Sequence, residues 1–121
     1  MTYDPISDVA DEPLTVLLSV IDALAEYRAL SKLDLLPGVD TTAERGRLTD
    51  LVNGLTDQLL AGVAEHPSKL WVMRKFQSTL LRLEDHDTEA REHLGMELEK
   101  LMDILGIESS DGLLSFYLGG L

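Results

Sequence analysis

The sequence contains no cysteine, and only 5% of its residues are aromatic. The absence of cysteine excludes disulfide bonds, thiolate chemistry and the common zinc sites that use cysteine ligands. Because aromatic residues are scarce, the core must be built from Leu, Val, Ile, Met and Ala. That composition favours helices packed on helices over a β-sandwich. We therefore expect an all-α protein.

Long apolar runs and positive charge are also lacking. No run approaches the roughly 18 to 20 residues needed to span a bilayer, and the N-terminus lacks the features of a signal peptide. Ten Lys and Arg residues stand against 22 Asp and Glu, giving a net charge of -12. This charge argues against direct binding to nucleic acid or to an anionic membrane. We expect a cytoplasmic protein whose charge leaves room for a basic protein partner.

The length and the hydrophobic content predict one globular domain. A chain of 121 residues that is 45% hydrophobic can bury a sizeable core without staples. Residues 1–12 are acidic and polar, and we expect them to form a flexible, loosely held arm. Residues 13–118 are expected to form a bundle of four helices plus a short C-terminal helix, and residues 119–121 a frayed tail.

The spacing of apolar residues predicts where each helix lies. The first helix is expected from Leu14 to Leu33, after a start at Pro13 with Asp11 or Glu12 as its cap. It is apolar on most of its circumference, so we expect it to be central in the domain or covered by a second subunit. The remaining helices are expected from a capping box at Thr41 to Val63, from Lys69 to Leu83 after a cap at Ser68, from Thr88 to Leu105, and from Asp111 to Leu118.

Charge is segregated between the third and fourth of these helices. The third carries four bases and no acid, whereas the fourth carries five acids against Arg91 and Lys100. Along the fourth, Glu92, Met96, Glu99 and Asp103 follow a spacing that turns them away from the core. A methionine framed by acids suits a docking surface for a basic partner, although a purely solubilising face has the same composition. The candidate partner-binding residues are Glu89, Glu92, Met96, Glu99 and Asp103.

A second candidate patch lies on the third helix. Trp71, the only tryptophan, falls by helical spacing on the side that carries the basic residues. Trp and Arg are common anchors of interfaces, which favours a partner-facing patch of Trp71, Arg74, Lys75 and Arg82. The alternative is that neighbouring acids pair with the bases while Trp71 packs under a loop.

Metal and catalytic sites find little support. Six possible ligands lie within ten residues, namely Glu84, Asp85, His86, Asp87, Glu89 and His93. Glu-x-x-His pairs and the HExxH and DxDxDG motifs are absent, however. An acidic turn complements the N-terminus of the helix that follows it. No nucleophile motif, phosphate loop or dinucleotide fingerprint occurs. We expect no metal, no cofactor and no enzymatic activity, and we keep a metal-dependent enzyme built on His86 and His93 as a third hypothesis.

Two stretches carry a resemblance to a known family. The segment MDILGIESSDGLL, Met102 to Leu114, and the DTEAREH helix start at Asp87 resemble a small bacterial family of all-helical proteins, known as a domain of unknown function. The resemblance covers roughly the last 45 residues and implies a helical fold without a catalytic motif. Small acidic bundles of this length are also similar in type to immunity proteins, which neutralise basic toxins. The predicted function is therefore a protein-binding module, and its most specific form is an immunity or inhibitor protein. The alternative is a structural or regulatory homodimer.

Overall fold

The computed structural model describes residues 3–30, 42–83 and 88–119. The elements are a short 3-10 helix η1 (Pro5–Asp8) and the helices α1 (Leu18–Ala29), α2 (Thr42–Gly62), α3 (Lys69–Leu81), α4 (Thr88–Leu105) and α5 (Leu113–Leu118). The expected all-α single-domain fold is confirmed. The expected capping box at Thr41, the acidic turn at residues 84–87 and the last residues of the tail lie outside the described residues.

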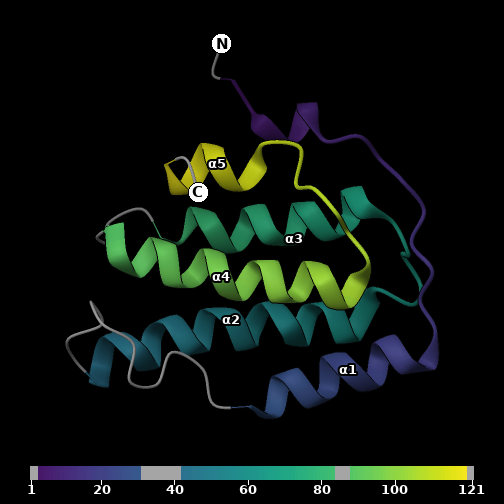
Figure 1. Ribbon diagram of the computed structural model, residues 1–121, viewed down its shortest axis with the longest axis horizontal. Helices are drawn as coiled ribbons and strands as arrows, with labels where there is room; N and C mark the ends of the chain where they lie inside the picture. Colours follow the sequence, from purple (N-terminus) through teal and green to yellow (C-terminus); the bar gives the residue numbers. More distant parts are fainter. Residues whose placement is uncertain (1–2, 31–41, 84–87, 120–121) are drawn as a thin grey trace.

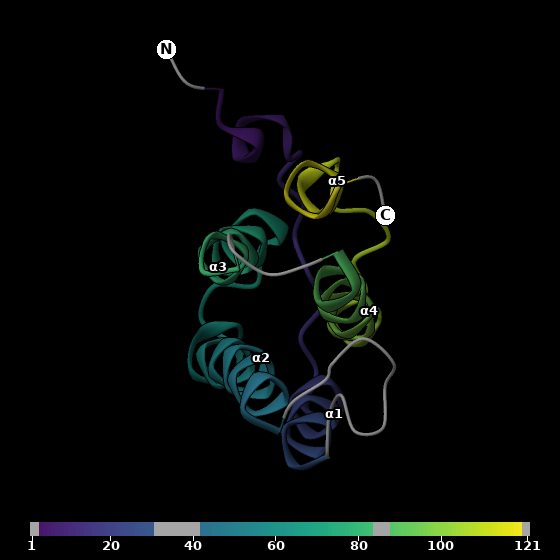
Figure 2. The same ribbon diagram turned by 90° about the vertical axis from the view of Figure 1, so that its left-hand side faces the viewer.

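Three long helices, α2, α3 and α4, run along the same axis and form the body of the molecule (Figure 1). Viewed along that axis, α5 and the N-terminal arm cover one side of this body, and α1 lies on the opposite side (Figure 2). Helix α4 contacts α1, α2 and α5, whereas α3 contacts α2, α5 and η1. The two shorter helices therefore close opposite faces of the same three-helix body.

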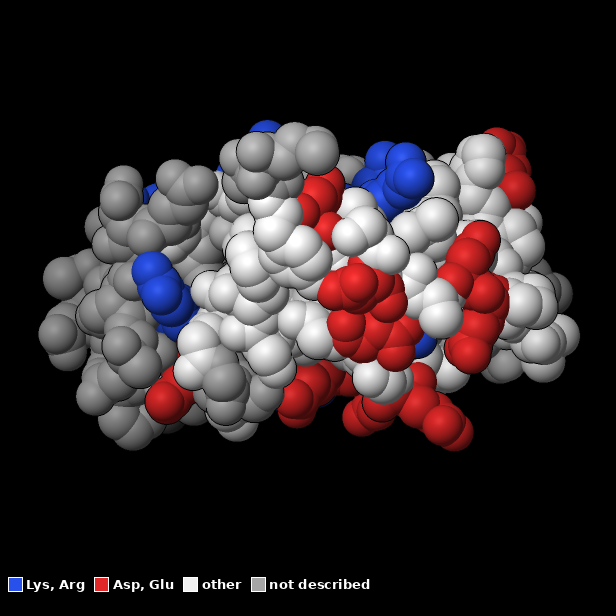
Figure 3. All heavy atoms as spheres, turned by 90° about the horizontal axis from the view of Figure 1, so that it is seen from above, with Lys and Arg blue, Asp and Glu red and all other residues white. Residues whose placement is uncertain are grey.

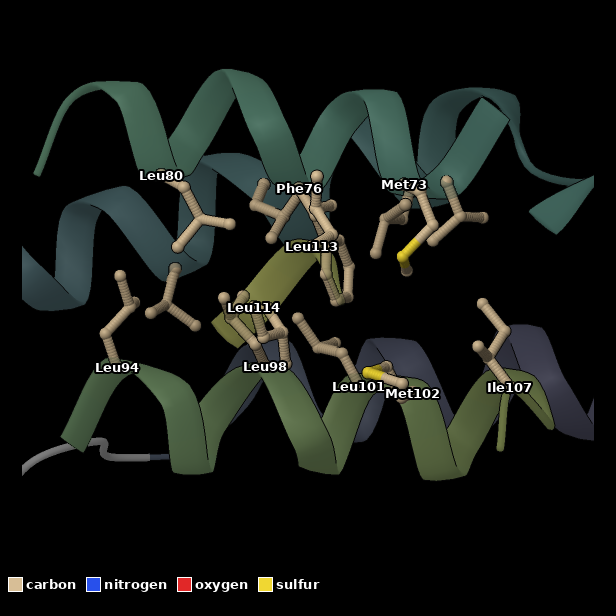
Figure 4. Close-up of a cluster of buried hydrophobic side chains, with 14 of the residues drawn as sticks. Met73, Phe76, Leu80, Leu94, Leu98, Leu101, Met102, Ile107, Leu113 and Leu114 are labelled. Carbon is tan, nitrogen blue, oxygen red and sulfur yellow. The ribbon is translucent and has the colours of Figure 1, made fainter. Parts of the chain in front are cut away.

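The core lies where the apolar stripes of the helices meet. Figure 4 shows side chains of α3, among them Met73 and Phe76, pointing toward Leu98 and Leu101 of α4. Leu113 of α5 enters the same cluster from the side, and all five side chains are fully buried. These residues recur with the helical period that the sequence shows.

Helix ends follow the expected signals at two places that matter for the site. Ser68 caps α3 by accepting a hydrogen bond at its hydroxyl from the N–H of Trp71 (3.2 Å). Gly106 ends α4 with a φ of 75°, a left-handed conformation that glycine adopts without strain. The N–H of Ile107 then donates to the carbonyl of Met102 (2.9 Å), as in a Schellman motif. The chain consequently turns back sharply after α4.

Helix α1 does not occupy the central position that we expected. It starts at Leu18, four residues late, because Pro13 pairs with Ser68 and the N–H of Leu14 donates to the carbonyl of Pro67 (2.7 Å). Only Leu24 and Tyr27 of this helix are buried, while Leu18 is 82% exposed. The expectation of a central helix was wrong because the apolar stripes of α2, α3 and α4 form most of the core, to which α1 adds Leu24 and Tyr27. The alternative, that a second subunit covers α1, stays a prediction.

Polar contacts of Tyr27 and Arg28 attach α1 to the body. The hydroxyl of Tyr27 donates to a carboxylate oxygen of Glu97 (2.8 Å), a buried residue of α4 that also accepts from Lys100 (2.9 Å). Arg28 pairs with Asp57 of α2 (2.8 Å). Glu97, one of the five acids counted in this helix, therefore faces inward.

The described part of the N-terminal arm, residues 3–12, forms hydrogen bonds with the bundle. A carboxylate oxygen of Asp11 accepts hydrogen bonds from the Ser68 hydroxyl (2.7 Å) and the N–H of Leu70 (3.0 Å). The N–H of Lys69 donates to the carbonyl of Glu12 (2.9 Å). The first N–H groups of a helix have no partner within the helix. The start of α3 therefore offers N–H donors, from which the acidic arm accepts hydrogen bonds.

Candidate functional site

The exposed stripe of α4 holds most of the predicted partner-binding residues. Glu92, Met96, Glu99 and Asp103 are all exposed, and Met96 exposes 53% of its surface. Leu94, Leu98 and Leu101 on the other side of the helix are fully buried. The structure places Glu89 within α4, but its side chain lies outside what is described. The stripe is therefore presented to solvent as its spacing predicts.

A cavity of about 320 Å³ lies where the last turns of α4 meet the connection to α5. It is lined by Glu99, Met102, Asp103, Ile107, Glu108, Ser109, Ser110, Leu114 and Ser115. We call this cavity the acidic pocket. Two residues of the predicted stripe, Glu99 and Asp103, line it, whereas Glu92 and Met96 lie on the helix beyond it. Sequence reasoning missed Glu108 and the three serines, since their approach to α4 depends on the turn after Gly106.

The local structure explains why these side chains converge. The Schellman motif at Gly106 folds Ile107 back onto α4, so Glu108 follows directly above the helix end. The Ser109 hydroxyl then accepts from the N–H of Asp111 (3.1 Å), and the Ser110 hydroxyl accepts from the N–H of Leu114 (3.2 Å). These hydrogen bonds fix the turn that forms one wall of the pocket, because local bonds between side chains and backbone define the conformation of a turn.

The floor and the rim of the acidic pocket differ in chemistry. Met102, Ile107 and Leu114 are buried and form an apolar floor. Glu99, Asp103 and Glu108 are exposed, and within the described part of the chain none of these three carboxylates forms an ion pair. An apolar floor beneath unpaired carboxylates suits a ligand with an aliphatic stem and a cationic head.

Acids also gather elsewhere on the molecule. Figure 3 shows the face of the molecule that is at the top of Figure 1. Asp and Glu side chains are concentrated over the half of this face on which the arm and the α4–α5 connection lie. Asp8, Asp11 and Glu12 of the arm are exposed. Hydrogen bonds from Ser68 and Leu70 lower the pKa of Asp11 below its usual range. Asp11 thus adds a negative charge at this side of the molecule.

The second candidate patch is less open than its sequence suggests. The Trp71 ring is half-buried and stacks on His66 with ring centres 5.5 Å apart. The Lys75 ammonium lies 5.2 Å from the ring centre, within cation–π range. The ring also packs on Gly62, where a Cβ atom would lie only 2.6 Å from Trp71 Cζ2. Trp71 thus packs into the corner between α2 and α3, although Arg74 and Arg82 are exposed.

The residues of the metal hypothesis can be placed only in part. His86 and its acidic neighbours at 84, 85 and 87 lie outside the described residues, and His93 is half-buried on α4. Across residues 3–30, 42–83 and 88–119, no group of three or more His, Asp and Glu side chains could hold a metal ion. In the same part of the chain, no helix is both long and apolar enough to cross a membrane.

Comparison with known proteins identifies a family. Residues 18–121 match the domain of unknown function DUF4844. No curated protein and no solved structure matches the chain. The match starts at the first residue of α1 and includes every residue of the acidic pocket, whereas the arm precedes it. It confirms the resemblance to an all-helical domain of unknown function, and the chain belongs to the DUF4844 family.

Proposed function

We propose that this protein is a non-catalytic binding module that docks a basic protein partner through the acidic pocket and the exposed stripe of α4. The observation that supports the proposal is the grouping of Glu99, Asp103 and Glu108, which form no ion pair among the described residues, around a cavity of about 320 Å³ with an apolar floor. Complementary charge accelerates the encounter of two proteins and excludes partners of the wrong sign.

The shape of the pocket favours a long basic side chain of the partner. Its aliphatic stem would pack on Met102, Ile107 and Leu114, while its charged head remains at the carboxylate rim. Met96, one turn before Glu99 on the exposed stripe, is 53% exposed and adapts its flexible side chain to an apolar part of the partner. Pocket and stripe together supply the charge and the contact area of one docking surface.

The most specific form of this proposal is an immunity or inhibitor protein of the cytoplasm. Such a protein neutralises a basic toxin by covering it, and needs a rigid acidic surface rather than catalytic groups. The net charge of -12 and the fixed turn that builds the pocket support this form, because preorganised groups lose little entropy on binding.

Capture by the immobilised protein tests the proposal. The site variant combines Glu99→Gln, Asp103→Asn and Glu108→Gln. A control variant with Asp22→Asn, Asp50→Asn and Glu65→Gln removes the same charge from exposed positions outside the pocket. We expect wild type and control to capture the same basic protein from a native lysate at low salt, and the site variant to lose it.

Two results would contradict the proposal. Equal capture by both variants would show that total charge, rather than the pocket, holds the partner. Capture of no basic protein by wild type at low salt would remove the reason for a docking surface altogether.

A structural or regulatory homodimer is the second candidate, and the exposure of α1 favours it. Leu18, the first residue of α1, is 82% exposed, and Leu17 and Leu30, which flank the helix, expose 60% and 62% of their surfaces. Large exposed apolar side chains are candidates for an interface. Light scattering should then give a mass of two chains, and Leu18→Gln should shift it toward one. An interface of α1 should resist raised salt, whereas pairing between the acidic stripe and the Arg74 and Arg82 side of another copy should weaken with salt.

A further inference from the structure

A second cavity, of about 340 Å³, lies where the arm passes over α3 and α5. It is lined by Tyr3, Asp4, Gln77, Leu81 and Tyr117, and it shares no residue with the acidic pocket. Three segments that are far apart in the sequence build it. We call it the tyrosine cleft, and its volume is in the range of small-ligand sites.

The aromatic rings around the cleft are held in place. Phe116 lies between the two tyrosines, with ring centres 5.5 Å from Tyr3 and 5.0 Å from Tyr117, in tilted and edge-on contact. Such contacts between rings are favourable. Tyr3 and Phe116 nevertheless remain 53% and 52% exposed, and Leu81 48%. Ring surface at the cleft and beside it is therefore packed against other rings and still open to solvent.

A hydrogen-bond network fixes the polar side of the cleft. Gln77 Nε2 donates to Asp4 Oδ1 (2.6 Å) and to the Tyr117 hydroxyl (3.0 Å). Asp4 Oδ1 also accepts from the N–H of Ile6 (3.1 Å). Because an amide nitrogen has two hydrogens, Gln77 has no donor left. Among the described residues, Gln77 Oε1 and Asp4 Oδ2 have no partner, so the unused groups of these two side chains are acceptors, and one is charged.

We propose that the tyrosine cleft binds the guanidinium group of an arginine side chain presented by a peptide segment. A guanidinium is a flat cation that stacks on aromatic rings and carries only donors, which match the two acceptor oxygens and the carboxylate charge. A lysine ammonium is compact and strongly hydrated, so it uses the ring faces less well. No Lys or Arg is among the described residues that line the cleft. This inference does not rest on the proposed function.

The test uses the full chain and a blocked peptide, acetyl-Gly-Arg-Gly-amide, with its Lys counterpart as the comparison. Binding is followed by NMR through the side-chain amide of Gln77 and the rings of Tyr3 and Tyr117. We expect saturable shifts at these groups with the arginine peptide, and binding of the lysine peptide that is roughly fivefold weaker.

Three variants separate the cleft from the general negative charge. Asp4→Asn keeps the shape of the side chain and removes its charge, and Tyr3→Ser removes one ring near the chain end. Glu12→Gln is the matched control, because Glu12 is an exposed acid of the same arm and lines a different part of the surface. We expect Asp4→Asn and Tyr3→Ser each to weaken binding at least about fivefold, and Glu12→Gln less than about twofold.

Three outcomes would overturn the inference. The first is a lack of selectivity: the two peptides bind with equal affinity, or Asp4→Asn and Glu12→Gln weaken binding equally. Either result would leave only long-range attraction. The second is shifts confined to the acidic pocket, which would favour the proposed docking site instead. The third is the absence of saturation up to about 10 mM peptide. Unchanged backbone signals elsewhere establish that each variant is folded.

Discussion

The N-terminal arm and helix α1 lie on opposite sides of the three long helices (Figure 1), and they are attached in different ways. The arm is acidic and polar, yet most of its length is bonded to the bundle. Helix α1 is rich in leucine, yet two of its residues are buried and its first leucine is 82% exposed. Apolar content alone would assign the two segments to the opposite roles.

The arm is held because the bundle presents donors and a buried cation that need acceptors. Asp11 and Glu12 accept from the first N–H groups of α3. Asp111, just before α5, accepts from the N–H of Ala10 (2.9 Å) and from the ammonium of Lys69 (2.8 Å). The Lys69 side chain is only 5% exposed. Arm, α3 and α5 therefore meet at one ion pair.

The attachment of α1 combines polar contacts with a narrow apolar face. Leu24 is fully buried, and the side chains of Tyr27 and Arg28 contact Glu97 and Asp57 of the body. The comparison teaches that a segment is fixed by the partners that its neighbours require. The exposed leucines of α1 require a partner outside the described chain or remain in water at modest cost.

The largest effect should follow from loss of the carboxylate of Asp111. Asp111→Asn leaves the Lys69 ammonium buried beside a neutral amide, and we expect the free energy of unfolding to fall by about 3 kcal/mol. Asparagine tolerates the positive φ of 54° at this position, so the backbone is not the cause. Lys69→Met removes the buried charge instead and should cost less, roughly 1 kcal/mol, since Asp111 keeps partial contact with solvent. Urea unfolding at pH 7 measures both values.

The pH dependence gives a control for this assignment. The contacts with Lys69 and with the N–H of Ala10 lower the pKa of Asp111 from its usual 3.8. The unfolded chain therefore binds the proton more readily, and this contribution to stability is present above pH 3.8 and is lost as the pH falls through the lower folded value. Wild type should lose more stability than Asp111→Asn as the pH falls through this range. Parallel losses would contradict the role of this carboxylate.

The next largest effect is expected in the corner between α2 and α3, where Trp71 packs on Gly62. Gly62→Ala places a methyl group 2.6 Å from Trp71 Cζ2, and we expect a loss of roughly 1 to 3 kcal/mol as the ring is displaced from its contact with His66. Gly54→Ala in the same helix is the matched control, because nothing lies within 4 Å of its Cβ position. It should stabilise the protein by up to about 1 kcal/mol. Urea unfolding and Trp71 fluorescence report both effects, and a stabilised Gly62→Ala would contradict the close contact.

The sequence predicts the fold better than it predicts the site. The stripes of α3 and α4, the cap at Ser68 and the glycine at 106 are local signals, and they are confirmed because local physics decides them. The acidic pocket needs Glu108 to reach Asp103, and the tyrosine cleft needs the arm to lie against α5. The pocket depends on the turn after Gly106, whereas the cleft depends on contacts between distant parts of the chain. Periodicity shows which face of a helix is apolar, but it does not show which other segment covers that face.

The smallest expected effect concerns the attachment of α1, through the hydroxyl of Tyr27. Tyr27→Phe leaves buried Glu97 with Lys100 as its remaining partner, so we expect a loss of about 1 to 2 kcal/mol in the free energy of unfolding at pH 7.

The contribution of the Tyr27 hydroxyl to stability should be lost at high pH, whereas that of the Asp111 carboxylate is lost at low pH. Burial and the hydrogen bond to Glu97 raise the pKa of Tyr27 above its usual 10.0. The folded protein then binds more protons than the unfolded chain above pH 10, so this contribution is fully present below pH 10 and declines as the pH rises. The gap in stability between wild type and Tyr27→Phe should therefore narrow between pH 9 and pH 11 in urea unfolding. A gap that stays constant there would show that the hydroxyl is ionised as easily in the folded protein as in the unfolded chain, and that its hydrogen bond to Glu97 does not help to attach α1.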